Sequence, residues 1–86
     1  MVINNIMNIK VKTFAALRDI FGRELSLEVE NDCCINQITE KLIELKPESS
    51  DLISSSRLAI NEEFLSGKDI VGDGDELLIL PPSSGG

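Results

Sequence analysis

Hydrophobic and polar positions alternate in two segments near the start of the chain. Residues 8–14 (NIKVKTF) alternate polar and apolar, and residues 23–30 (RELSLEVE) repeat the pattern. Such alternation is typical of strands with one buried face. Residues 15–21 between them predict one or two helical turns, which Gly22 ends. The two strands are therefore expected to form a loose antiparallel hairpin.

The pattern then changes to steps of three and four residues over residues 35–45, which is typical of an amphipathic helix. Asn31 or Asp32 can cap the start of this helix. Pro47 ends it, because a proline ring cannot follow in a continuing turn. Residues 48–56 are mostly polar, and we expect a surface loop with a short helical turn.

Three further segments complete the predicted sheet. Residues 57–61 indicate a short strand, followed by a turn into residues 64–65. Residues 71–75 (VGDGD) are a strong turn signal before a continuously apolar strand at residues 76–80. The first and last strands can pair in parallel, because a helix and a crossover separate them. One helix across a mixed sheet of four or five strands predicts an α+β fold, the β-grasp (ubiquitin-like) roll.

The chain is long enough for a single small domain. We expect residues 1–7 to be a loose extension, residues 8–80 to be the β-grasp domain and residues 81–86 to be a flexible tail. A domain of this size buries only about 60–65% of its unfolded surface, so little core is spare for a substrate pocket. The chain has no histidine, the usual acid–base group near neutral pH. Catalysis by this chain alone is therefore not expected.

The charge of the chain limits the classes of partner that it is expected to bind. Its formal net charge is −7, from 15 acidic and 8 basic residues, and the basic residues are scattered along the sequence. Nucleic-acid binding is therefore disfavoured; the acidic surface is explained by solubility, with a basic protein partner as the alternative. No apolar run approaches about 18 residues, and the start lacks the features of a signal peptide. We expect a cytoplasmic protein that does not enter membranes.

Two clusters suggest chemistry, but each has a simpler interpretation. Cys33 and Cys34 could be reactive thiols near a helix start, yet small spacers in the core are the favoured interpretation. No histidine or third cysteine is available for a zinc site. The carboxylates at Asp69 and in residues 73–76 lack the spacing of a calcium loop, so a turn is favoured. No metal site is expected.

The tail (PPSSGG) offers clearer chemistry. Pro81 and Pro82 hold its exit from the sheet extended, and Ser83 and Ser84 lengthen it. The tail can reach roughly 20 Å, and a Gly85–Gly86 tip can enter a slot too narrow for side chains. An ionised terminal carboxylate can attack the α-phosphorus of ATP if a partner supplies the nucleotide. An idle, unstructured terminus is the alternative.

Several segments of the chain resemble a known family. Residues 73–86 (DGDELLILPPSSGG), residues 9–18 (IKVKTFAALR) and the turn at Asn61 resemble the small sulfur-carrier subunits of molybdopterin synthase, which are ubiquitin-like. The resemblance implies that an adenylyltransferase of the ubiquitin-activating type adenylates Gly86 with ATP. A sulfur donor then makes a thiocarboxylate, whose sulfur passes to a cyclic pterin precursor on the large synthase subunit. Gly85 gives backbone access, and this chain itself binds no cofactor.

The resemblance also implies a partner-binding surface at Phe14, Phe64 and Leu80. The alternation independently places Phe14 on the outer face of the first strand. Ser83 departs from the family, where an apolar residue such as valine is common, and this should weaken one tail contact. The alternatives are a carrier for thiazole synthesis or tRNA thiolation, a protein modifier joined to lysines through Gly86, and a plain ubiquitin-like binding module.

Overall fold

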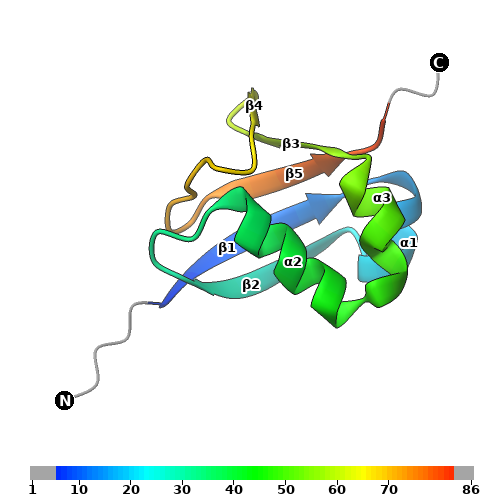
Figure 1. The fold of residues 1–86 in the computed structure, drawn as a ribbon, viewed down its shortest axis with the longest axis horizontal. Coiled ribbons are helices and arrows are strands. Elements are labelled where there is room, and N and C mark those ends of the chain that lie inside the picture. Colours follow the sequence, from blue (N-terminus) through cyan, green and yellow to red (C-terminus); the bar gives the residue numbers. More distant parts are fainter. Residues whose placement is uncertain (1–5, 83–86) are drawn as a thin grey trace.

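The computed structural model describes residues 6–82 (Figure 1). Within this range two strand–helix pairs are followed by a 3₁₀ turn, a short helix and three strands, and the longest helix follows the first two strands. The elements are β1 (Ile6–Thr13), α1 (Ala15–Phe21), β2 (Glu24–Glu30), α2 (Ile35–Leu45), a 3₁₀ turn η1 (Pro47–Ser49), α3 (Ser50–Ser54), β3 (Arg57–Ile60), β4 (Glu63–Leu65) and β5 (Glu76–Leu80). The predicted loop at residues 48–56 thus contains a 3₁₀ turn and a short helix.

The strands form one mixed sheet in the order β2-β1-β5-β3-β4. β1 and β2 pair antiparallel, as the hairpin prediction required. β5 pairs parallel with β1 on one side and antiparallel with β3 on the other, so the last strand of the chain is central. In Figure 1, α2 crosses one face of the sheet, and α1 and α3 lie towards the end where β5 finishes. This is the predicted β-grasp arrangement.

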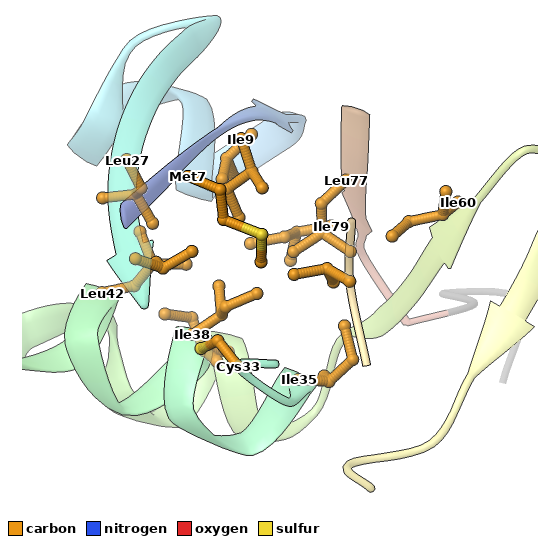
Figure 2. Packing of buried hydrophobic residues seen from close by; sticks show 14 of the residues in the cluster. Met7, Ile9, Leu27, Cys33, Ile35, Ile38, Leu42, Ile60, Leu77 and Ile79 are labelled. Carbon is orange, nitrogen blue, oxygen red and sulfur yellow. The ribbon is translucent and has the colours of Figure 1, made fainter. Parts of the chain in front are cut away.

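The hydrophobic core fills the space between α2 and the sheet face that it covers. Leu77 and Ile79 of β5 and Ile38 of α2 are fully buried at its centre. Figure 2 shows these side chains converging from the strands and the helix. Because strand side chains alternate between faces, burying Leu77 and Ile79 directs Leu78 and Leu80 to the opposite, outer face.

The first strand begins two residues earlier than predicted. β1 starts at Ile6, and Met7 is only 4% exposed and packs in the core (Figure 2). The predicted loose extension, residues 1–7, was therefore wrong at Ile6 and Met7. Residues 1–5 lie outside the described residues.

The start of α2 also differs from the prediction. Its N-cap residue is Cys34, and neither Asn31 nor Asp32 caps the helix. The first backbone N–H groups instead donate to distant carbonyls: Ile35 N to Asp69 O (2.9 Å) and Asn36 N to Gly67 O (3.0 Å). The loop after β4 therefore satisfies donors that a local side chain was expected to satisfy.

Candidate functional site: the exit of the C-terminal tail and the surface around it

The C-terminal segment leaves the molecule from the centre of the sheet. Leu80 ends β5 half-buried, and Pro81 and Pro82 follow on the surface. The two prolines line a small recess together with residues 14–17, Leu52 and Ser56. The start of the tail is thus seated between the β1–α1 turn and the α3–β3 connection. The predicted tail residues Ser83, Ser84, Gly85 and Gly86 lie outside the described residues.

Phe14 lies beside this exit. It is the N-cap residue of α1, its backbone is extended, and its side chain is 40% exposed. Thr13 pairs with Ile79 in the parallel β1–β5 ladder, so continuing the register places Phe14 next to Leu80. The buried Thr13 anchors the turn, because its hydroxyl donates to the Gly22 carbonyl and its backbone N–H donates to Arg23 O.

Phe64 and Leu80 share the outer face of the sheet. Residues opposite one another in a ladder point to the same side. The ladders align four residues in a row across this face: Lys12, Leu78, Ala59 and Phe64. Leu80 lies two residues beyond Leu78 and so points to the same side. Phe64 is 59% exposed, an unusual position for a large aromatic ring.

Arg57, which no sequence motif marks as a site residue, joins this surface. Arg57 lies opposite Leu80 at the β3–β5 ladder, and its guanidinium stacks over the Phe64 ring, 4.5 Å from the ring centroid. A cation over an aromatic face is stabilised by the ring quadrupole. The alternation of the short strand could have indicated an outward arginine, but its contact with Phe64 depends on β3–β4 pairing. We call Phe14, Leu80, Arg57 and Phe64 the exit surface.

The acidic segment before β5 is a turn, as predicted. Its carboxylates accept hydrogen bonds from backbone N–H groups: Asp73 Oδ1 accepts one from Asn8 N (2.9 Å), and Asp75 Oδ2 accepts one from Gly72 N (2.7 Å). Gly74 has a φ of +83°, a conformation that favours glycine. Across residues 6–82, no three histidine, cysteine or acidic side chains group as a metal site would require. The carboxylates hold the turn that starts the central strand.

The two cysteines pack as small side chains. Cys33 is buried, Cys34 is half-buried, and neither forms a disulfide. Burial, and then the neighbouring Cys34, raises the pKa of the Cys33 thiol above its ordinary value of 9.0. Raising the pKa lowers the thiolate fraction near neutral pH, which disfavours Cys33 as a nucleophile. The burial of Cys33 in the core agrees with the spacer interpretation.

In the part of the chain that the structure describes, no helix has the length and apolar character needed to cross a membrane.

Similarity to known proteins extends over nearly the whole chain. The chain is 35% identical over 81 residues to the molybdopterin synthase sulfur carrier subunit of Arabidopsis thaliana, covering 93% of this chain and 84% of that protein. It is 33% identical over 82 residues to the protein of the same name from Dictyostelium discoideum, covering 90% and 94% of the two chains.

Two solved structures with the same fold carry different kinds of name. Small archaeal modifier protein 1 from Methanosarcina acetivorans is 29% identical, with a TM-score of 0.76 and coverage of 94% of this chain and 98% of that one. A complex of subunits 1 and 2 of the molybdopterin-converting factor from Helicobacter pylori contains a chain with a TM-score of 0.67 at 18% identity, with coverage of 93% and 100%. The model of the ThiS family matches residues 11–86, from the first strand through the C-terminal glycines, and the chain therefore belongs to the ThiS family.

Proposed function

We propose that this chain is the sulfur carrier of molybdopterin synthesis and that Gly86 carries the sulfur. The observation behind the proposal is the similarity, over at least 90% of the chain, to relatives named molybdopterin synthase sulfur carrier subunit. The Gly85–Gly86 end supplies the group that such chemistry needs. The described surface supports the proposal, since exposed apolar side chains surround the point where the tail leaves the sheet.

Loading the carrier with sulfur takes two covalent steps in the proposed cycle. A Gly86 carboxylate oxygen attacks the α-phosphorus of ATP on an adenylyltransferase of the ubiquitin-activating type, and pyrophosphate leaves. A sulfide equivalent from a sulfur donor then attacks the acyl carbon, and AMP leaves, which gives a thiocarboxylate. ATP is bound by the partner, and this chain holds no cofactor of its own. Dependence on cellular ATP leads us to place the carrier in the cytoplasm.

The loaded carrier then docks on the large subunit of molybdopterin synthase. There the thiocarboxylate sulfur forms a bond to a carbon of the cyclic pterin precursor as an oxygen leaving group departs from that carbon, and water cleaves the acyl–sulfur bond, which returns the Gly86 carboxylate. The chain contributes geometry to this step. Pro81 and Pro82 restrict the backbone to extended conformations at the base of the tail. Phe14, Phe64 and Leu80 provide apolar area for docking at the base of the tail. The complex of subunits 1 and 2 from Helicobacter pylori shows that a protein of this fold assembles with a second subunit.

Removing Gly86 tests the proposal directly. We expect the truncated chain to melt like the full-length chain and to support no molybdopterin formation in an assay reconstituted with the large subunit, the adenylyltransferase and a sulfur donor. A Ser83→Ala variant is the matched control in the tail, and it should retain synthesis. Intact mass of the full-length chain from cells should show a fraction with one terminal oxygen replaced by sulfur. Molybdopterin synthesis by the truncated chain would refute the carrier role.

A protein modifier is the second candidate, and it is favoured by the similarity to small archaeal modifier protein 1. The same acyl-adenylate can be transferred to a lysine amine in place of sulfur. Mass spectrometry of cellular proteins should distinguish the two, because a modifier leaves a glycine-terminated branch on lysines. Finding these branches without any thiocarboxylate would favour the modifier. Capture of the large subunit by the intact chain would favour molybdopterin synthesis over thiazole synthesis or tRNA thiolation.

A further inference from the structure

A basic recess lies beside the exit surface. Lys12, Arg18 and Arg23 line a hollow of about 340 Å³ together with Thr13, Phe14 and Glu24. The chain as a whole carries 15 acidic and only 8 basic residues, so three cations at one hollow run against its average charge. They come from β1, α1 and the turn before β2, and they are brought together by the Thr13 bonds to Gly22 and Arg23.

The arginines of this recess have no carboxylate partner among the described residues. The two ion pairs in residues 6–82 are Lys10–Glu24 (3.9 Å) and Lys12–Glu76 (3.5 Å), and neither includes Arg18 or Arg23. Both arginines are exposed. An arginine presents a planar set of N–H donors that fits a carboxylate with two parallel hydrogen bonds. The recess therefore offers unused donors to an anionic group.

The position of the recess indicates where the anion comes from. Phe14 lines both this hollow and the recess that seats Pro81 and Pro82, so the basic recess is continuous with the exit surface. A protein that receives the tail and covers Phe14 must also cover the rim of the basic recess. Its contact there would remove the arginines from water without compensation unless it brings a negative charge to pair with them.

We propose that the basic recess receives a glutamate or aspartate side chain of the protein that docks on the exit surface, and that this contact orients the carrier as its tail inserts. The proposal rests on the proposed function, since it needs a docking partner for the tail. The recess is a binding element only, and no covalent step takes place in it.

Calorimetric titration of the full-length chain with the large subunit of molybdopterin synthase tests the inference. Changing Arg18 and Arg23 to alanine together should raise the dissociation constant about tenfold or more, and should reduce the dependence of the affinity on salt. The control changes Lys46 and Lys68 to alanine, two exposed lysines outside the recess that lower the net charge by the same amount. This control should change the affinity less than about threefold. An arginine-to-lysine pair should retain part of the affinity, because it keeps the charge but loses the planar donors.

A second variant should change the docking affinity in the opposite direction. Among the described residues, Glu24 is the one carboxylate lining the recess, and it would repel the incoming acid. Glu24→Gln should tighten docking a few-fold, whereas Glu28→Gln, an exposed change on the same strand and outside the recess, should leave it unchanged.

Equal affinities for the wild-type chain, the arginine variant and the lysine control would overturn the recess proposal while leaving the carrier role intact. Inorganic phosphate that saturates the recess and displaces the large subunit at low concentration would also overturn it, in favour of a phosphate ligand. If the wild-type chain does not bind the large subunit at all, the proposed function fails, and the recess proposal fails with it.

Discussion

The position of Met7 gives a quantitative test of where the folded domain begins. Met7 is 4% exposed and lies opposite Val29 in the β1–β2 ladder, whereas its neighbour Ile6 is 49% exposed. Met7→Ala removes the Cγ, Sδ and Cε atoms from the core. Burying such a side chain stabilises a fold by about 1.5–3 kcal/mol, and incomplete collapse of the cavity adds to the loss. Methionine is flexible and its neighbours can adjust, so we expect a loss of about 2–3 kcal/mol.

Chemical denaturation followed by circular dichroism measures this loss, with Ile6→Ala as the matched control. The control should cost less than about 1 kcal/mol, because roughly half of that side chain is already in water. In a domain of this length, the Met7 variant should melt about 10–20 °C below the wild type. Equal, small losses in both variants would show that β1 starts after Met7 and that the chain before Asn8 is outside the fold.

Four further predictions rest on the described contacts. The raised pKa of Cys33 contributes stability that is complete below the ordinary thiol pKa of 9.0 and is lost as the pH rises through the higher pKa of the folded state. The free energy of unfolding should therefore fall above about pH 9, and it should fall less in the Cys33→Ala variant. Iodoacetamide at neutral pH should modify Cys34 before the buried Cys33, and mass spectrometry after digestion would reveal a reversed order. Gly74→Ala should cost about 1 kcal/mol in thermal melts, because alanine is strained at a φ of +83°, and no loss would contradict that backbone conformation. Phe64→Ser should weaken large-subunit binding about tenfold in calorimetry and leave the melting temperature unchanged, since the Phe64 ring is mostly exposed. Full affinity would show that Phe64 does not contribute to docking.

The tertiary structure decided the details that depend on contacts between distant residues. The start of α2 shows this clearly, since Asn31 and Asp32 were the expected local caps. The N–H groups of Ile35 and Asn36 donate instead to backbone carbonyls more than thirty residues along the chain, at Asp69 and Gly67. Local sequence does not indicate that such carbonyls will be present, so it favours a cap at Asn31 or Asp32 that the fold does not use. The start of β1 is similar, because only pairing with β2 shows that Met7 belongs to the ladder.

The same distinction applies to the candidate site. Periodicity predicted that Phe14 faces outward, and the exposed position of the side chain agrees with it. Strand register determined that Phe64 and Leu80 share a face with Arg57, and the turn between α1 and β2 determined that Lys12 and Arg18 line one recess with Arg23.

The sequence by itself determined the order and type of the main elements, because alternation and helical spacing record which side of each segment is buried. It also indicated the parallel pairing of the first and last strands, since a helix and a crossover between them permit it. The chemistry proposed for Gly86 likewise starts from the sequence, because a Gly-Gly pair is recognised without any knowledge of packing. Only the tertiary structure decided which side chains surround the base of that terminus, because ladder register and loop anchoring bring together residues that are far apart in the chain.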